Sequence, residues 1–327
     1  MDGFINLNKP AHWTSHDCVA RVRRLLNTKK VGHGGTLDPL AIGVLPLAVG
    51  RATRLLQYLP ASKSYRAIIR FGMTTVTDDL EGEVLTQRDA AHLQLSDIEA
   101  LLPQFVGTLS QTPPMYSAIQ VQGKRLYDLA RQGKTVDVPV RQVVVHQLTP
   151  VEWRSGKQPE LAVEIECGPG TYIRSLARDL GEALGSGATL AQLTRTHSSG
   201  FNLLNSLTLA ALEQAIAAES FVPDAAGKAV EHLRAIALSP PLARRWCQGQ
   251  KLALTEPGIS GLSDRQRLTQ ISAPPWQPLR ILNDATKDFL GIGEIRALPK
   301  ISDEGTALKD LSNVLAAKMV FWKADGE

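Results

Sequence analysis

The sequence predicts an α+β protein that is divided into two domains, residues 1–240 and residues 241–327. In the first domain, short segments with alternating apolar residues predict strands, and amphipathic segments predict helices. Pro240 and Pro241 mark the boundary, because two prolines end the Ala-rich helix that we expect over 208–237. The tail is rich in Gly, Pro and short apolar runs, which predicts a small β-rich domain.

The bulk composition is that of a globular protein, with 43% hydrophobic and 21% charged residues. The three cysteines, Cys18, Cys167 and Cys247, lie far apart without a C-x-x-C pair. This spacing argues against a zinc site and a disulfide framework, and it fits a reducing cytoplasm. The start lacks the basic and apolar segments of a signal peptide, and no run of about 18 apolar residues predicts a membrane span. We therefore expect a cytoplasmic monomer without a bound metal.

Positive charge is concentrated at the start of the chain. Residues 1–70 contain eleven Lys and Arg against three Asp, a net charge of +8, so the remainder carries −4 of the total of +4. A basic segment of this kind predicts a polyanionic partner, most simply nucleic acid. The alternative is a basic surface that contacts only solvent.

The basic segment is expected to form a helix, a buried strand and a second helix. Ser15 is predicted to cap the first helix, in which apolar residues such as Cys18 and Val22 recur at helical spacing. Residues 43–49 are too few and too apolar for a surface helix and predict a buried strand, whereas residues 51–59 predict a helix.

Alternation predicts a strand over 64–71, with Tyr65 and Phe71 on one face. The other expected elements are strands over 116–121, 140–148 and 160–167, a turn over 77–82, a helix over 96–106 and a long loop over 255–278. A Gly-Pro-Gly turn then opens a helix from which Arg174 and Arg178, four residues apart, project together. Its buried stripe is expected to comprise Ile173, Leu176, Ala177, Leu180 and Leu184.

One aspartate stands out in the segment VGHGGTLDPLAIGVLPLAVG, residues 31–50. Pro39 disfavours a helical conformation for Asp38, and Gly34 and Gly35 permit close approach of another backbone. The apolar run that follows would anchor the loop in the core and hold the carboxylate as catalysis requires. The segment lacks the spacing of a P-loop or a dinucleotide fingerprint and offers too few ligands for a metal. Alternatively, Asp38 caps the turn that follows.

The segment GHGGTLDPLAIGVL resembles the signature of the bacterial tRNA pseudouridine-55 synthases, the TruB family. Further segments resemble that family in the same order: LNKPAHWTSHDCV, KSYRAIIRFG, TDDLEG, PPMYSAIQVQGKRLYDLARQG and CGPGTYIRSLARDLG. They cover most of residues 3–200, and the tail resembles more weakly the small RNA-binding domain of the family. The resemblance implies a pseudouridine synthase fold with a curved, mixed and mostly antiparallel sheet, followed by a PUA-like RNA-binding domain.

The resemblance also implies a reaction on tRNA, the isomerisation of uridine 55 in the T-loop without a metal, nucleotide or redox cofactor. The N1–C1′ bond is cut, the uracil turns, and C5 joins C1′. Asp38 matches the catalytic aspartate, which would attack the sugar or the base or remove a sugar proton; an ionised carboxylate suits the positive character that develops at C1′. Tyr65 matches the active-site tyrosine, and Arg174 matches the arginine that pairs with the aspartate. Without the resemblance, Tyr65 would be a core aromatic and Arg174 a helix-surface residue.

Tyr172 and Leu193 match pocket-lining positions, and His33 matches a histidine that helps evert the uridine or fills the space that the base leaves. The basic residues that we expect to contact phosphates of the T-arm are Lys29, Lys30, Arg51 and Arg54. Two residues depart from the family pattern: His12 stands where glycine is usual, and Gln120 stands where lysine is usual. The first indicates a different local turn. The second indicates either the absence of one RNA contact or that another residue supplies it.

Three alternatives remain. If the chain is an RNA-binding or tRNA-folding protein, an Asp38 variant will keep full biological activity. If it is a component of an RNA-guided synthase, naked tRNA will not react. If it is a nucleoside hydrolase that uses Asp38, free uracil will be released.

Overall fold

The computed structural model describes residues 1–117, 119–121, 123–127, 137–261, 277–301 and 307–321. The chain forms two compact units. We call the larger one the sheet unit; it comprises Ile5–Leu47 and Pro60–Val222. The tail unit comprises Met1–Phe4, Ala48–Leu59 and the chain from Pro223 onward. The division at residue 240 stays a prediction about the functional domains.

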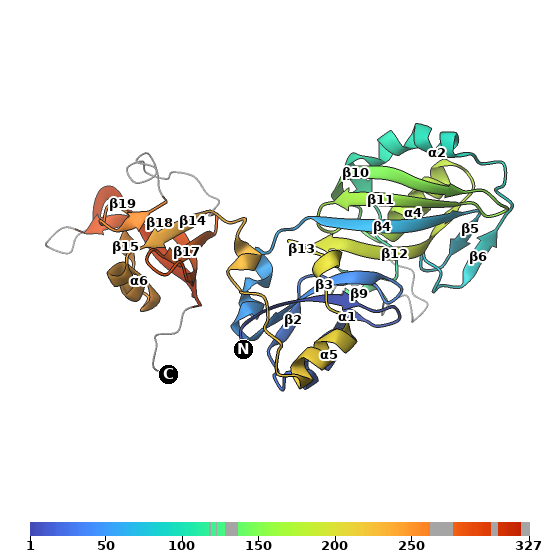
Figure 1. Ribbon diagram of the computed structural model, residues 1–327. Helices are drawn as coiled ribbons and strands as arrows, with labels where there is room; N and C mark the ends of the chain where they lie inside the picture. Colours follow the sequence, from blue (N-terminus) through green and yellow to red (C-terminus); the bar gives the residue numbers. More distant parts are fainter. Residues whose placement is uncertain (118, 122, 128–136, 262–276, 302–306, 322–327) are drawn as a thin grey trace. The chain divides into compact units, whose positions relative to one another are not determined.

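The sheet unit is built on a nine-stranded sheet in the order β1-β3-β12-β4-β11-β10-β7, with β13 beside β12 and β2 beside β3 (Figure 1). Its strands are β1 (Gly3–Lys9), β2 (Val31–His33), β3 (Ile42–Val49), β4 (Lys63–Phe71), β7 (Gly107–Gln111), β10 (Arg141–Arg154), β11 (Glu160–Cys167), β12 (Ala188–Ser198) and β13 (Phe201–Asn202). Strands β12, β4, β11, β10 and β7 pair antiparallel in that order, whereas β12 and β3 pair in parallel. The predicted mixed and mostly antiparallel sheet is therefore confirmed.

The helices of this unit are α1 (Ser15–Leu25), α2 (Leu95–Leu101), α4 (Ile173–Ala183) and α5 (Leu209–Ala217), with short 3₁₀ helices η2 (Leu102–Phe105) and η3 (Leu203–Asn205). The prediction that Ser15 caps α1 is wrong by one residue. The backbone N–H of Asp17 donates to Thr14 Oγ1 at 3.0 Å, so Thr14 is the cap. Because the cap role falls to Thr14, the hydroxyl of Ser15 is left for another contact.

Two predicted helices differ from the structure. Residues 51–59 form a 3₁₀ helix, η1 (Gly50–Tyr58), rather than an α-helix. The expected Ala-rich helix over 208–237 ends at Ala217, and the end of that segment belongs to strand β14 (Ala235–Leu238). Alanine favours a helix locally, but β14 gains hydrogen bonds in the sheet of the tail unit, and that tertiary pairing decides its conformation.

Two short hairpins lie where the sequence predicted a turn over 77–82 and a strand over 116–121. The turn over 77–82 lies between β5 (Met73–Thr75) and β6 (Val84–Gln87), which pair antiparallel. The strand expected over 116–121 is limited to β8 (Gln120–Val121), which pairs with β9 (Lys124–Arg125).

The tail unit contains a six-stranded sheet in the order β15-β19-β18-β17-β14-β16, which confirms the predicted β-rich tail. Its remaining elements are η4 (Lys228–Val230), α6 (Pro240–Cys247), β15 (Leu252–Ala253), β16 (Ile259–Ser260), β17 (Leu279–Asn283), β18 (Phe289–Ile301) and β19 (Ala307–Val320). Trp246 is completely buried in the core of this unit. The loop expected over 255–278 lies mostly outside the described residues.

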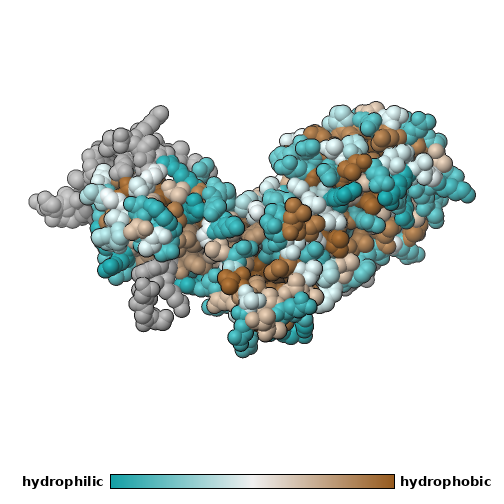
Figure 2. All heavy atoms as spheres, in the orientation of Figure 1, coloured by the Kyte–Doolittle hydropathy of each residue, from teal (hydrophilic) through white to brown (hydrophobic). Residues whose placement is uncertain are grey.

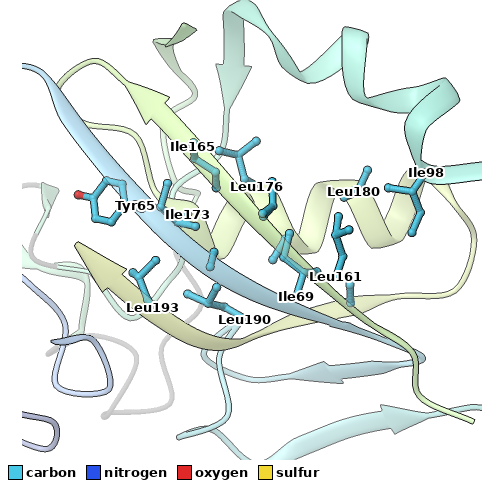
Figure 3. Packing of buried hydrophobic residues seen from close by; sticks show 14 of the residues in the cluster. Tyr65, Ile69, Ile98, Leu161, Ile165, Ile173, Leu176, Leu180, Leu190 and Leu193 are labelled. Carbon is cyan, nitrogen blue, oxygen red and sulfur yellow. The ribbon is translucent and has the colours of Figure 1, made fainter. Parts of the chain in front are cut away.

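The core of the sheet unit lies between the sheet and helix α4. On β4, Tyr65, Ala67, Ile69 and Phe71 are all buried, as the alternation predicted, while the residues between them are more exposed. Figure 3 shows Tyr65 at one end of this cluster, with its hydroxyl directed away from Ile69. A core residue therefore carries a polar group to the edge of the core.

The surface in Figure 2 is largely hydrophilic, with hydrophobic residues scattered among the polar ones. Leu204 is the most exposed of the large hydrophobic residues, at 96%. In the described part of the chain, no helix has the length and apolar character that a membrane span requires.

The core packing predicts a stability difference between two leucines. Leu161→Ala should lower the free energy of unfolding by about 2–5 kcal/mol, because Leu161 is fully buried and its truncation leaves a cavity. The matched change Leu204→Ala should cost less than about 0.5 kcal/mol, because that side chain already contacts water. Urea unfolding followed by circular dichroism measures both. Equal losses in the two variants would contradict the assignment of the core.

Candidate active site

The loop that carries Asp38 is held through the backbone of both neighbouring residues. The N–H of Leu37 donates to Ser15 Oγ at 2.9 Å, and the Ser15 hydroxyl donates to the carbonyl of Leu37 at 3.2 Å. The carbonyl of Pro39 accepts from Lys9 Nζ at 3.1 Å and from the backbone N–H of His12 at 2.8 Å. Asp38 is therefore fixed on each side, as a positioned carboxylate requires.

Lys9 lies at the end of β1 and is completely buried. Its ammonium also donates to the carbonyls of Pro10 and Trp13, at 2.8 and 2.7 Å. Burial lowers the pKa of Lys9 to about 8, against the smaller opposing effect of Asp38 and other groups. Three carbonyl acceptors compensate in part for the loss of water around this ammonium.

His12 explains the first departure from the family pattern. Its φ angle is +63°, in the left-handed region that favours glycine. The backbone N–H of His12 donates to the carbonyl of Pro39 in this conformation. Its side chain is 80% exposed, and Nδ1 lies 3.8 Å from Glu81 Oε1. The second departure, Gln120, is exposed on β8.

The side chain of Asp38 forms an ion pair with Arg174, and Oδ2 lies 3.0 Å from Nε. Arg174 is only 5% exposed, whereas Asp38 is 33% exposed, so the carboxylate is the part of the pair that solvent or a ligand reaches. Asp79 Oδ2 lies 3.6 Å from the same Nε. Nη1 and Nη2 of Arg174 donate to the carbonyls of Thr77 and Tyr116, at 2.9 and 3.1 Å. The guanidinium is thus fixed by backbone groups and faces two carboxylates.

Arg174 owes its position to the start of α4. The side-chain amide of Gln111 accepts from the N–H of Tyr172 at 2.8 Å and donates to its carbonyl at 3.0 Å, which ties the start of α4 to β7. One turn further on, Arg178 Nη1 donates to Asp78 at 2.9 Å and links the helix to the 77–82 turn. The expectation that Arg174 and Arg178 share a face is consistent with these contacts.

The charge of Asp38 acts on both predicted tyrosines. Burial raises the pKa of Tyr65, and the negative charge of Asp38 adds to the rise, while Arg195 opposes it. Burial also raises the pKa of Tyr172, with a smaller contribution from Asp38 in the same direction. Both phenols are therefore held in the neutral form near the Asp38 carboxylate.

Leu193 and His33 are the other two residues that the resemblance predicts to act on the base. Leu193 is buried, faces Ala67 across β12 and β4, and belongs to the same core cluster as Tyr65 (Figure 3). His33 is half-buried, and burial together with His16 and Arg195 lowers its pKa below the ordinary value. Its Nδ1 accepts from the N–H of Gly35 at 3.4 Å, which suits a neutral imidazole.

The predicted phosphate contacts fall in both units. Lys29 and Lys30 are exposed at the connection between α1 and β2, and Arg54 is exposed on η1. Arg51 differs from them, because its Nε donates to Asp2 at 2.9 Å and its guanidinium lies 5.0 Å from the ring centre of Phe321. Arg51 therefore already has partners within the tail unit, and its phosphate contact stays a prediction.

The sequence did not single out Lys9, Asp79 or Arg195 as parts of the site. Lys9 and Asp79 lie in segments that resembled the family, but nothing in their spacing indicates contacts with Pro39 or Arg174. Arg195 on β12 is fully buried and bonds to backbone carbonyls of residues distant in the sequence. Among the described residues, no group of three His, Cys, Asp or Glu side chains is arranged to hold a metal ion.

Comparison with family models defines the class of protein. Residues 23–173 match the N-terminal domain of the TruB family pseudouridylate synthases. Residues 174–238 match the C-terminal domain of tRNA pseudouridylate synthase B, and residues 235–301 match the C-terminal domain of pseudouridine synthase II TruB. Together with the fold and the Asp38 site, these matches define a pseudouridylate synthase.

Comparison with similar sequences identifies the family within this class. Proteins named tRNA pseudouridine synthase B from Nostoc sp. (strain PCC 7120 / SAG 25.82 / UTEX 2576) and Acaryochloris marina (strain MBIC 11017) are 52% and 58% identical to this chain. The alignments cover 91% and 90% of this chain and 96% and 95% of those proteins. The chain belongs to the TruB family.

The structural comparison agrees with this assignment. A chain from an H/ACA ribonucleoprotein bound to a substrate RNA that contains 2′-deoxyuridine superposes with a TM-score of 0.69 and 25% identity. A chain from an archaeal Nop10–Cbf5 complex gives 0.68 and 27%. Both matches cover 99% of this chain, and they cover 86% and 87% of the solved chains. The predicted pseudouridine synthase fold is confirmed.

The contacts of Ser15 predict that its hydroxyl stabilises the Asp38 loop. Ser15→Ala should lower the free energy of unfolding by about 1–3 kcal/mol, because both backbone groups of Leu37 lose their partner inside the protein. Ser220→Ala is the matched control, since that exposed hydroxyl bonds only to the carbonyl of Ala215 and should contribute less than about 0.5 kcal/mol. Chemical denaturation measures both, and a Ser15 variant as stable as the control would disprove the role of this hydroxyl.

Proposed function

We propose that this chain converts uridine 55 in the T-loop of tRNA into pseudouridine, as a cytoplasmic monomer that acts without a cofactor. The ion pair between Asp38 and Arg174 carries the proposal, because it places an accessible carboxylate beside a buried, fixed cation. The names of the relatives, tRNA pseudouridine synthase B, support tRNA as the substrate. The family resemblance of the Asp38 segment supports position 55.

The reaction rearranges bonds within one nucleotide. The N1–C1′ bond breaks, uracil rotates, and a C5–C1′ bond forms; C5 then loses its proton and N1 gains one. As N1 leaves, positive character develops at C1′, and the Asp38 carboxylate stabilises it from close range. One carboxylate suffices, because the uracil is retained and no water has to be activated.

Arg174 and Tyr65 act on Asp38 and on the base, respectively. Arg174 holds the carboxylate in one orientation, because its fixed guanidinium lies 3.0 Å from Oδ2 of Asp38. Tyr65 offers a neutral phenol at the edge of the core, where its ring stacks on the uracil and its hydroxyl assists removal of the C5 proton. Tyr172 and Leu193 line the pocket around the base.

The uridine must leave the folded T-loop before it can enter the pocket. Everting a base costs a few kcal/mol, which a stacking partner and a wedge offset. His33, neutral and half-buried beside the Asp38 loop, fills the space that the base leaves. The T-arm is held mainly through its phosphates and its shape, by basic residues of the first 70 and by the β-rich tail.

The role of Asp38 is tested on unmodified tRNA transcript without any guide RNA. Asp38→Asn should abolish pseudouridine formation and leave the dissociation constant of the RNA largely unchanged. Asp89→Asn, which changes an exposed aspartate, should behave like the wild type. Pseudouridine is mapped by carbodiimide-stopped reverse transcription, and RNA binding by filter retention.

The alternatives give different outcomes in the same assay. An Asp38→Asn variant that forms pseudouridine at the normal rate would refute the catalytic assignment. A wild type that is inactive on naked transcript would favour an RNA-guided enzyme, and free uracil would indicate a hydrolase.

The proposed phosphate contacts of Lys29 and Lys30 are tested by salt dependence. The double change Lys29→Ala and Lys30→Ala should weaken RNA binding at low salt, because two exposed cations are removed. The slope of log Kd against log salt concentration should fall by about 1 for each lysine that binds a phosphate in the wild type. Lys157→Ala, at an exposed position between β10 and β11, is the control. An unchanged slope in the double variant would rule out phosphate binding by these lysines.

A further inference from the structure

Arg195 is a buried cation whose task is not evident from the proposed reaction. It lies on β12, two residues after Leu193, and its side chain is completely inaccessible to solvent. Within the described residues it forms no ion pair with a carboxylate. Burying an unpaired guanidinium is costly unless its N–H groups are satisfied. The positions of its acceptors therefore indicate what this arginine does.

Its three acceptors belong to the two ends of the Asp38 loop. Nη2 donates to the carbonyl of Gly35 and Nη1 to that of Thr36, both at 3.1 Å. Nε donates to the carbonyl of Val44 at 2.7 Å, on the strand that follows the loop. One planar group thus joins the residues just before Asp38 to those just after it. Only a guanidinium offers such a rigid fork of donors; a lysine ammonium does not.

The backbone of Arg195 also lies close to the two strands that flank β12. Arg195 is the register partner of Gly43 on β3 and of Tyr65 on β4. Gly43 has a φ of +105°, and a Cβ at this position would overlap the carbonyl oxygen of Arg195, so only glycine permits this approach. Strand β12 therefore holds the end of the Asp38 loop on one side and Tyr65 on the other.

The guanidinium also acts on Tyr65. Burial raises the pKa of Tyr65, and the positive charge of Arg195 opposes the rise. The same cation contributes to the lowered pKa of His33, after burial and His16. A single side chain thus bonds to the loop of the proposed catalytic aspartate, and its charge acts on the proposed base-stacking tyrosine, which is its register partner on β4.

We propose that Arg195 is a positioning residue for pseudouridine formation, which fixes the Asp38 loop relative to Tyr65 on the neighbouring strand without touching the uridine. This inference rests on the proposed function. It differs from the role of Arg174, which pairs with the carboxylate of Asp38 itself. Arg195 acts instead through the loop backbone and through Tyr65.

The test compares Arg195→Lys, which keeps the charge but loses the fork, with Arg70→Lys as a matched control. Arg70 lies on the same sheet, where its Nε bonds to Glu160 at 2.9 Å near the surface. Single-turnover rates at saturating enzyme and RNA dissociation constants are measured well below the melting temperature. Arg195→Lys should lower the rate about 10- to 100-fold, because a loop shift of about 1 Å suffices for such a loss. RNA affinity should stay within about threefold of the wild type, and the control should change neither quantity.

A second variant separates positioning from stability. Arg195→Gln removes the charge, so ultraviolet titration should show the Tyr65 phenol ionising at higher pH than in the wild type. A merely structural role would lower the melting temperature and leave both the rate of the folded protein and this titration unchanged. Either of those results would overturn the inference.

Two further outcomes complete the design. If neither variant folds, NMR of the wild type decides: slow exchange and hindered rotation of the Arg195 Nη protons support the clamp, and rapid exchange overturns it. An inactive wild type would reject the proposed function and this inference with it. An active wild type with an equally active Arg195→Lys would reject the inference alone.

Discussion

The geometry of the site depends on one interaction, the ion pair between Asp38 and Arg174. The carboxylate of Asp38 is accessible, so it needs a fixed cation beside it to hold one orientation. Arg174, buried and held by the carbonyls of Thr77 and Tyr116, supplies the compensating charge. Because the cation is fixed by the protein backbone, the orientation of the carboxylate does not depend on the substrate.

The sheet brings segments that are distant in the sequence to one place. Asp38 comes from the loop between β2 and β3, Tyr65 from β4, and Arg174 from the start of α4. Two of these segments are held by contacts that are remote in sequence: Ser15 and Lys9 hold the Asp38 loop, and Gln111 holds the start of α4. Most of these contacts are hydrogen bonds to backbone groups, and a mutation does not change the chemistry of a backbone N–H or carbonyl. The geometry of the site is therefore encoded in a few polar side chains around it rather than in Asp38, Tyr65 and Arg174 themselves.

The sequence predicted those features that repeat locally. The alternation on β4, the amphipathic start of α4 and the β-rich tail needed only periodicity and turn residues. Asp38, Tyr65 and Arg174 came from the resemblance to the TruB family, and the structure brings Asp38 and Arg174 into contact. Arg195 and Lys9 could not be found in this way, because a side chain that donates to a carbonyl remote in the sequence produces no periodic pattern of residues. The long helix over 208–237 was wrong for the related reason that the partner of β14, strand β17, lies in a different part of the chain.

The most direct measurement is a crystal structure of the Asp38→Asn variant with an RNA hairpin that reproduces the T-arm and contains the target uridine. We expect the uridine to be turned out of the loop, with the side-chain oxygen of residue 38 about 3.5 Å from C1′ and the uracil against the ring of Tyr65. A uridine that stays stacked inside the RNA, or a ribose that lies far from residue 38, would contradict the assignment of this carboxylate as the group that acts on the sugar.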